Sequence, residues 1–355
     1  MSFSALNLAR PAIVNMRAYQ SARSQTTSAT ARIYLDANEL AEGSPRELAR
    51  YPDPQPAELQ DFLTARLGVP ADNLFLGAGV DDAIDALLRV FCEARQDSIV
   101  VTPPTYGYYK VAAAIQGADV ANAPLKAETF DLDEAAILRS LTANTKLVFV
   151  CNPNNPTGNA YGHERLLKLA SEIGRRALLV VDEAYIEFTN RPSLASAAAR
   201  PGNLVVLRTL SKAWGLAGVR LGAAVADPEV IALMHKVRAP YPIARPAVTA
   251  AMAELQTLTP DALAKRVAAV TMARQKLMTQ LQELSCVKHV YPSESNFILM
   301  RTSNAASVMR CCAGAGIIVR DRSKELGLAD CVRISVGTEA ESAALIAALS
   351  AGENP

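Results

Sequence analysis

The feature that most constrains the fold is a regular alternation of short apolar runs with helical segments between residues 73 and about 236. Short Val/Ile/Leu runs bounded by turn residues are typical of buried strands, and strands that alternate with helices form parallel sheets. The expected strands are 73–76, 98–101, 146–151, 177–182 and 204–207. We therefore predict an α/β fold whose mostly parallel sheet carries helices on both faces.

Residues able to do chemistry follow the ends of these strands. The carboxyl ends of parallel strands meet at one edge of the sheet, where open α/β sheets bind their ligands. The residues that we expect at this edge are Gly79, Tyr106, Asn155, Asp182 and Lys212.

Lys212 lies in the loop 208–220, just after the last of these strands. A lysine there can form a Schiff base with an aldehyde cofactor if burial and nearby cations lower its pKa. The hydroxyls of Thr209 and Ser211, together with Arg220, can hold a phosphate. An amine and a phosphate site on one loop indicate pyridoxal 5'-phosphate. A surface lysine and arginine flanking a polar turn fit the same loop, which alone does not separate the two interpretations.

Asp182 ends a fully apolar strand. A carboxylate at the end of a buried strand is costly unless it has a cationic partner. A protonated pyridine nitrogen is such a partner, and pyridoxal phosphate needs that proton for its ring to act as an electron sink. Tyr185 follows closely enough to hydrogen-bond the ring hydroxyl. Asp182 also fits a helix N-cap, a buried salt bridge or a Walker B acid, although no GxxxxGK[ST] loop accompanies it.

Three further positions each carry two interpretations. The glycine turn 77–82 opens a helix that runs to about residue 92, and a helix N-terminus favours a bound phosphate, but capping by Asp81 explains the same turn. Tyr106 can stack on a planar cofactor or simply pack beside two neighbouring tyrosines. Asn155 can project its amide into a site or only close a rigid proline-rich turn.

Composition excludes several classes of function. A net charge of +1 favours neither nucleic acid nor an acidic membrane surface. Six cysteines without CxxC spacing and three scattered histidines indicate neither a metal site nor a disulfide framework, and a reducing, cytoplasmic compartment fits best. No apolar run reaches membrane-spanning length. The arginine- and serine-rich stretch before Asp36 resembles a mitochondrial leader, but we favour a functional segment at 19–23.

The chain outside the alternating region predicts a second, smaller unit. Residues 33–39 are expected to form a short strand followed by a polar turn, 240–246 a linker and 261–284 a long connecting helix. Strand-like runs at 297–300, 317–320 and 331–336, with helices at 305–313 and 340–349, are typical of an α+β lobe. We divide the chain into an N-terminal arm that also forms part of the small domain (1–45), a large cofactor-binding domain (46–240) and a linker, connecting helix and small C-terminal domain (241–355).

Together these motifs resemble the fold-type I aminotransferases of the aspartate aminotransferase superfamily. The resemblance rests, in family order over nearly the whole chain, on Asn155-Pro-Thr-Gly158, Asp182-x-x-Tyr185, Ser211-Lys212 with Arg220, and Arg333-Ile-Ser335. Further segments resemble the subgroup that acts on histidinol phosphate: Tyr19-Gln-Ser-Ala-Arg23, Leu35-Asp-Ala-Asn-Glu39, Tyr51-Pro-Asp-Pro-Gln-Pro56, Pro103-Pro-Thr-Tyr-Gly107, Asp182-Glu-Ala-Tyr-Ile-Glu-Phe188, Arg208-Thr-Leu-Ser-Lys-Ala213 and Arg333-Ile-Ser-Val-Gly-Thr338. It implies transfer of an amino group between L-histidinol phosphate and 2-oxoglutarate, with pyridoxal 5'-phosphate as cofactor.

The resemblance also implies how the cofactor is held. Lys212 would bind it covalently and move the proton at the substrate's Cα, and Asp182 would pair with the ring nitrogen. The ring itself would be contacted by Tyr106, Asn155 and Tyr185. The phosphate would be held by Gly79, Val80, Asp81, Ser211, Arg220 and, from a second subunit, Tyr51. A tyrosine that crosses to a second subunit implies a homodimer with shared sites.

Substrate recognition is implied in the same way. Arg333 would bind the carboxylate of glutamate and of 2-oxoglutarate, and Arg320 would join Arg333 and Tyr19 around the phosphate of histidinol phosphate. A guanidinium fork fits carboxylate and phosphate alike. Asn38 and Asn296 would line the substrate pocket. The alternative for both arginines is a surface salt bridge.

Three positions depart from the family pattern, at Val80, at Trp214-Gly215 and at Ala18, which leaves the placement of Tyr19 open. Three other functions fit a similar framework: an aromatic amino acid aminotransferase, a threonine-phosphate decarboxylase, and a cofactor-binding regulator. A regulator of this kind carries an added DNA-binding domain with a basic face, for which this chain has neither a spare segment nor the charge.

Overall fold

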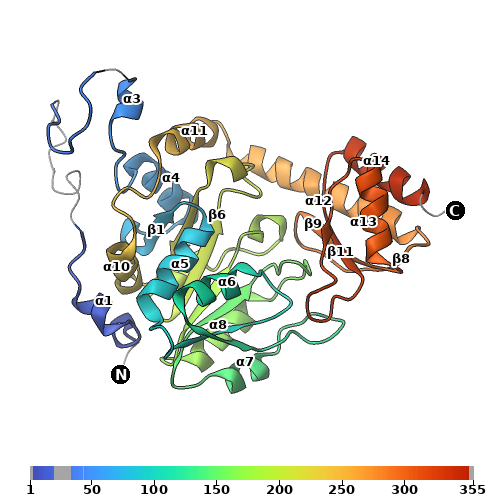
Figure 1. Cartoon of the computed structure of the whole chain (residues 1–355), viewed down its shortest axis with the longest axis horizontal. Helices are drawn as coiled ribbons and strands as arrows, with labels where there is room; N and C mark the ends of the chain where they lie inside the picture. Colours follow the sequence, from blue (N-terminus) through green and yellow to red (C-terminus); the bar gives the residue numbers. More distant parts are fainter. Residues whose placement is uncertain (1–2, 20–32, 43, 352–355) are drawn as a thin grey trace.

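The computed structural model describes residues 3–19, 33–42 and 44–351. Its centre is a seven-stranded sheet with the order β1-β7-β6-β5-β4-β2-β3 (Figure 1). The strands are β1 (Leu74–Gly77), β2 (Ser98–Val101), β3 (Asp119–Asn122), β4 (Thr145–Cys151), β5 (Leu178–Asp182), β6 (Leu204–Thr209) and β7 (Gly222–Val225). Strands β3, β2, β4, β5 and β6 are parallel, and β7 runs antiparallel to β6 and β1. The predicted mostly parallel sheet is confirmed.

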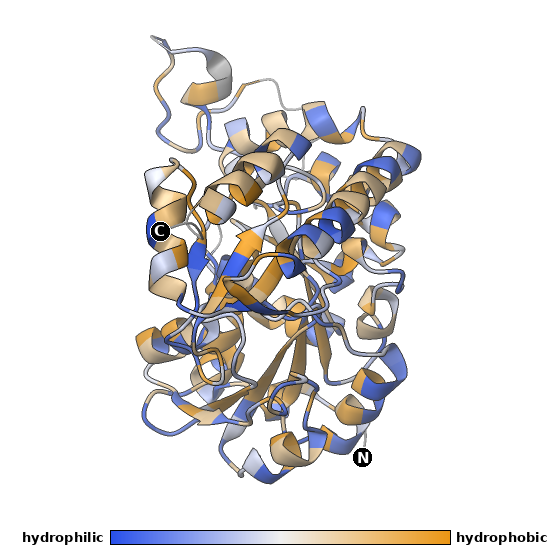
Figure 2. Ribbon diagram, turned by 90° about the vertical axis from the view of Figure 1, so that its right-hand side faces the viewer, coloured by the Kyte–Doolittle hydropathy of each residue, from blue (hydrophilic) through white to orange (hydrophobic). Residues whose placement is uncertain are grey.

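The apolar strands separate two hydrophobic cores. Alternate side chains of a strand point to opposite faces, so Val180 packs into one core while Leu179 and Val181 pack into the other. One core includes α5 (Val80–Phe91), α6 (Tyr108–Gln116) and α10 (Pro228–Val237). The other includes α4 (Ala57–Leu67), α7 (Glu134–Ser140), α8 (His163–Ile173), α9 (Ala195–Ala198) and α11 (Arg245–Leu255). The predicted helices on both faces are therefore present, and Figure 2 shows the strands between them as hydrophobic.

A second sheet is antiparallel and has the order β10-β11-β9-β8. Its strands are β8 (Val287–Val290), β9 (Phe297–Thr302), β10 (Arg320–Asp321) and β11 (Cys331–Ser335), covered by α13 (Ala305–Gly314) and α14 (Glu339–Ala351). The long helix α12 (Pro260–Gln282) runs from the large sheet toward this part of the molecule (Figure 1). Its start is specified locally, because the Thr259 side chain caps the amide of Ala262 and Pro260 occupies the first turn.

The N-terminal segment does not form the strand expected at 33–39. Leu35 is 90% exposed, and the segment is held through Arg50, which bonds the Tyr34 carbonyl and the Glu39 carboxylate. A strand needs a neighbour for its backbone groups, and residues 33–39 pair with no strand in the described structure. The expected polar turn is present, with bends at Asp36 and Ala37 and with Asn38 at φ 56°, but the short strand before it does not form.

Among the residues that the structure describes, no helix combines the length and the apolar character needed to cross a lipid bilayer. The six cysteines all lie in the described ranges and all are free thiols.

Candidate active site

The carboxyl ends of the parallel strands open onto a cavity of about 540 Å³. Eleven of the residues expected from the sequence line it: Val80, Asp81, Tyr106, Asn155, Asp182, Tyr185, Ser211, Lys212, Arg220, Arg320 and Arg333. The last two come from the small sheet, so the cavity lies between the two sheets. Gly79 lies at its margin, because a Cβ on Gly79 would stand 2.7 Å from the Arg220 guanidinium.

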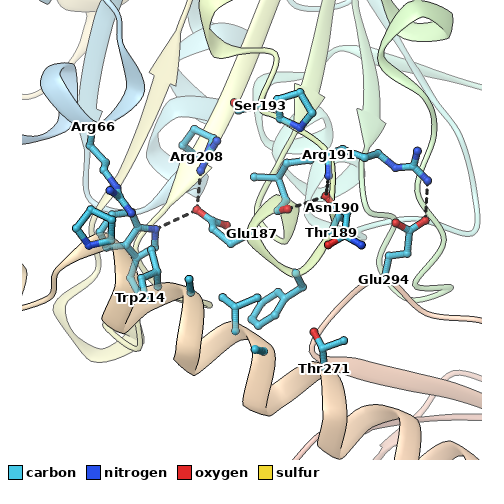
Figure 3. A pocket seen from close by; sticks show the side chains of 18 of the residues that line it. Arg66, Glu187, Thr189, Asn190, Arg191, Ser193, Arg208, Trp214, Thr271 and Glu294 are labelled. Atoms are coloured by element: carbon cyan, nitrogen blue, oxygen red, sulfur yellow. Dashed lines mark hydrogen bonds and ion pairs between the residues drawn. The ribbon is translucent and has the colours of Figure 1, made fainter.

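A larger cavity, of about 920 Å³, lies between α12 and the segment that follows β5 (Figure 3). Four of its charged groups are paired with one another: Glu187 accepts from Arg208 and also from Trp214, and Arg191 contacts Glu294 at 2.9 Å. None of the residues expected from the sequence to do chemistry lines this cavity. Volume therefore does not identify the active site; convergence of titratable groups does.

Asp182 stands at the bottom of the smaller cavity with both oxygens already engaged. The Tyr109 hydroxyl donates to Oδ2 at 2.7 Å, and the Ala184 amide donates to Oδ1 at 3.0 Å. Burial raises the pKa of Asp182 to about 6, and the two donors oppose that rise because they favour the charged form. Among the described residues, the carboxylate neither caps a helix nor takes part in a salt bridge. Its remaining acceptor capacity faces the cavity.

Lys212 lies three residues beyond the end of β6, on the same edge as Asp182. Burial lowers its pKa first, and the positive charges of Arg333 and Arg220 lower it further, while Asp182 acts in the opposite direction. Its Nζ stands 5.6 Å from the centre of the Tyr185 ring. Burial and nearby cations are the conditions under which a lysine becomes a nucleophile, so the condition set from the sequence is met.

Asn155, Tyr185 and Arg333 form one hydrogen-bonded group. The Asn155 amide nitrogen approaches the Tyr185 hydroxyl at 3.3 Å, and its carbonyl oxygen accepts from the Arg333 guanidinium. Tyr185 is buried, which raises the pKa of its hydroxyl and keeps it protonated at neutral pH. The small sheet thus reaches the large sheet through a residue of the rigid turn after β4.

The start of α5 forms a cradle for an anion. Gly79 precedes the helix with φ +88°, and no side chain caps the first turn. Gly222 of the neighbouring β7 approaches so closely that a Cβ there would meet the Val80 amide nitrogen at 2.5 Å. Arg220, itself at φ 55°, reaches Ser211 at 3.5 Å from the other side. Unblocked amides, a hydroxyl and a guanidinium are the donor set that a phosphate ester requires.

Asp81 does not cap α5, contrary to the simpler interpretation of the turn. Its carboxylate lies 3.4 Å from Arg220 and accepts from the Tyr106 hydroxyl at 3.1 Å. The neighbouring Asp82 engages the turn before the helix instead, because its carboxylate accepts a hydrogen bond from the Ala78 amide. A cap by Asp81 would occupy the backbone amides of the cradle. Because Asp81 contacts Arg220 and Tyr106 instead, these amides are available to a bound anion. The donor set, with Asp182 facing the cavity, therefore fits pyridoxal 5'-phosphate.

The mouth of the cavity carries three arginines and one glutamate. Arg320 lies directly opposite Arg333 in the register of β10 and β11. Arg322, two residues along, also lines the cavity and pairs with Glu325 at 2.5 Å. The sequence analysis missed Arg322 and Glu325, because only strand register shows that Arg322 shares a face with Arg320. It also missed Tyr108 and Cys151 as lining residues, whereas Thr209, expected near the phosphate, does line the cavity.

Four expected site residues do not line the cavity of their own chain. Tyr19 is 76% exposed, and Asn38 is also exposed. Asn296 bonds through its backbone to Val336. Tyr51 stacks on Tyr241, with ring centres 4.4 Å apart. The rest of the 19–23 segment lies outside the described residues.

Comparison with known proteins agrees with the fold and the site described above. The model of the family "Aminotransferase class I and II" matches residues 13–349. The chain therefore belongs to the class I and II aminotransferase family.

The similarity extends to particular members of that family. The chain is 40% identical over 354 residues to the histidinol-phosphate aminotransferase of Stenotrophomonas maltophilia, covering 98% of this chain and 96% of that protein. It is 41% identical over 351 residues to the enzyme of the same name from Aeromonas salmonicida, covering 98% of each. The structure of histidinol-phosphate aminotransferase from Sinorhizobium meliloti in complex with pyridoxal-5'-phosphate superimposes with a TM-score of 0.78 at 28% identity, over 86% of this chain and 83% of that one.

Proposed function

We propose that the protein transfers an amino group between L-histidinol phosphate and 2-oxoglutarate, as a histidinol-phosphate aminotransferase in histidine biosynthesis. The observation that carries the proposal is the joint lining of one cavity by a buried carboxylate, a lysine of lowered pKa and four arginines. The similarity to enzymes of that name over nearly the whole chain supports it.

The cofactor is pyridoxal 5'-phosphate, which supplies an electron sink when its ring nitrogen is protonated. We assign its phosphate to the cradle of Gly79, Val80, Asp81, Ser211 and Arg220, with the backbone amides of Val80 and Asp81 as donors. Asp182 faces the ring nitrogen, while Asn155 and Tyr185 bind the ring hydroxyl. Tyr106 packs against the ring. The contacts at 3.3 to 3.5 Å among the side chains of this set leave room for each to turn toward a ligand.

Lys212 moves the proton at the substrate's Cα. An ammonium group cannot accept a proton, so the lysine acts only in its neutral form. Burial and the two nearby arginines lower its pKa, which enlarges the neutral fraction at pH 7. In one half of the reaction glutamate gives up its amino group; in the other, imidazole acetol phosphate receives it.

Charge at the mouth of the cavity supports a substrate with a phosphate. Three arginines and one glutamate leave a surplus of two positive charges, which matches a phosphate monoester dianion. We assign Arg333 to the carboxylate of glutamate and 2-oxoglutarate, and Arg320 with Arg333 and Tyr19 to the substrate phosphate. We also assign Asn38 and Asn296 to the substrate pocket, as the family resemblance implies.

A homodimer is part of the proposal. Tyr51 is 47% exposed and lies outside its own chain's cavity, which leaves it available to the phosphate of a second subunit. The N-terminal arm exposes Ile33, Leu35 and Leu40, an apolar surface that a second copy would cover. Sedimentation equilibrium should give twice the chain mass, and a monomer with full activity would exclude shared sites.

We also propose that the chain divides into residues 1–45, 46–240 and 241–355. A cytoplasmic location is proposed as well.

The deciding experiment is a single half-reaction. Histidinol phosphate is added to the holoenzyme without 2-oxoglutarate, and imidazole acetol phosphate is quantified while the cofactor's visible absorbance is followed. We expect one product per active site and a matching spectral change. No reaction, followed by conversion of phenylalanine or tyrosine, would indicate an aromatic aminotransferase. Release of carbon dioxide from threonine phosphate would indicate the decarboxylase.

A further inference from the structure

Tyr109 is a polar residue of the site that the cavity does not expose. Its side chain is 0% exposed, and its hydroxyl donates to Asp182 Oδ2 at 2.7 Å. We infer that Tyr109 is a positioning residue that holds the Asp182 carboxylate in place and in its charged form, ready for the cofactor's ring nitrogen. The inference rests on the proposed pairing of Asp182 with that nitrogen.

The Tyr109 ring is fixed by its surroundings. It stacks on Phe149 of β4, with ring centres 4.7 Å apart and planes 15° apart, and meets the Tyr106 ring edge-on at 5.4 Å. It belongs to the first turn of α6, which packs on the sheet. A ring locked in this way loses little further freedom when its hydroxyl forms a hydrogen bond. The bond to Asp182 is therefore preorganised before any cofactor arrives.

Tyr109 can only donate in this position. Burial and the neighbouring Asp182 raise the pKa of its hydroxyl well above the ordinary value, so the proton stays on the tyrosine. Asp182 is itself fully buried, and burial alone favours its neutral form. A neutral carboxyl group offers no charge to a pyridinium. The hydrogen bond from Tyr109 opposes that outcome more than any other single neighbour does.

The other groups around Asp182 do not replace this bond. The Ala184 amide engages the opposite oxygen, the positive charge of Lys212 acts more weakly, and Asp81 acts in the opposite direction. The remaining titratable neighbours, which face Asp182 from β4, the turn after β5 and the turn before α6, are Cys151, Tyr185 and Tyr106. All three are uncharged at neutral pH because burial raises the pKa of each.

The test measures cofactor affinity rather than turnover. Apo protein is prepared as wild type, Tyr109→Phe, Asp182→Asn and the double variant, and the dissociation constant for pyridoxal 5'-phosphate is measured by fluorescence titration. Phenylalanine keeps the ring stack and removes only the donor. We expect Tyr109→Phe to weaken binding about 10- to 100-fold, the range for a hydrogen bond to a charged group. In the Asp182→Asn background the same change should matter less than about 3-fold.

The pH dependence gives a second readout. Affinity should fall as pH drops through the pKa of Asp182, because the protonated acid loses its attraction for the ring nitrogen. Removal of the Tyr109 donor raises that pKa, so the fall should occur at higher pH in Tyr109→Phe. Site-specific 3-fluorotyrosine at position 109, a stronger donor of nearly the same shape, should move it to lower pH and remains informative if Tyr109→Phe folds poorly.

Tyr161→Phe is the matched control. Tyr161 is also buried and donates to a backbone carbonyl, that of Phe130, at 3.1 Å. It belongs to the opposite core, so its loss should change stability and leave cofactor affinity unaltered. Equal losses from Tyr109→Phe in both backgrounds, or an unmoved pH profile, would overturn the inference. Unchanged affinity in Asp182→Asn would instead show that the proposed cofactor pairing is wrong.

Discussion

The bottom and the mouth of the active-site cavity, here called its inner and outer ends, differ in how their charged groups are compensated. At the inner end, Asp182 is 3% exposed and each of its oxygens has a fixed donor. At the outer end, Arg320 is exposed, and Arg322 and Arg333 are only partly buried. The fixed donors around Asp182 suit a cofactor that stays bound. The unbalanced positive charge at the outer end suits anionic substrates that bind and dissociate in each reaction.

The strand register shows how unusual the outer end is. Arg320 and Arg333 face each other across β10 and β11, and like charges directly opposite destabilise a sheet. Burial also lowers the pKa of Arg333, and its arginine neighbours lower it further. A bound dianion would remove this repulsion. A fold that retains this repulsion among three arginines with one nearby carboxylate, Glu325, is typical of an anion-binding site rather than of a structural ion pair.

Lys212 stands between the two ends, and its removal should have the largest effect. Lys212→Ala should lower turnover by several orders of magnitude with either amino donor, because no other amine lines the cavity among the described residues. After borohydride reduction of the holoenzyme, mass spectrometry should find the cofactor on the Lys212 peptide and nowhere in the variant. Lys168→Ala, at an exposed surface ion pair, is the control. Retained turnover in Lys212→Ala would remove the central assignment.

Asp182→Ala tests the inner end. Loss of one partner of a buried ion pair costs about 3–5 kcal/mol, so kcat/KM should fall by roughly 150- to 5,000-fold. Because Asp182 acts on the cofactor, the loss should be similar for histidinol phosphate and for glutamate. Steady-state kinetics with each donor measures it. A loss confined to one donor would place Asp182 among the substrate contacts and collapse the distinction between the two ends.

Arg320→Ala tests the outer end, where effects should depend on the substrate. We expect kcat/KM for histidinol phosphate to fall about 10- to 100-fold, and that for glutamate to change by less than about 3-fold, since the glutamate carboxylate is assigned to Arg333. Arg301→Ala is the matched control: Arg301 lies in the same sheet and does not line the cavity. Equal losses for both donors would show that Arg320 does not select the phosphate.

The sequence predicted the inner end better than the outer one. Asp182 and Lys212 follow apolar runs that can only be buried strands, so their place at one sheet edge follows from chain order. The hydrogen bond from Tyr109 could not be predicted, because its spacing from Asp182 depends on how α6 packs on β4. The short strand β7, Gly-Ala-Ala-Val, has only one of the branched side chains that signal a strand, Val225.

Positions that depend on more than local pattern were beyond the sequence. Arg322 reaches the cavity only because β10 pairs with β11 in one register. The residues 33–39 looked like a strand, yet a strand exists only where another backbone accepts its hydrogen bonds. Tyr19, Tyr51 and Asn38 lie away from the cavity of their own chain, and no single chain can test a contact with a second subunit.

The smallest effects should come from the ion pair Arg322–Glu325 at the cavity mouth. Glu325 already neutralises part of the Arg322 charge, so Arg322→Gln should weaken inhibition by inorganic phosphate only about 2- to 5-fold, the scale of a partly exposed pair. Glu325→Gln releases that charge and should strengthen phosphate inhibition by a similar factor. Inhibition constants against glutamate measure both. If the two variants weaken phosphate equally, the pair only supports the loop, and the surplus charge of the outer end belongs to Arg320 and Arg333 alone.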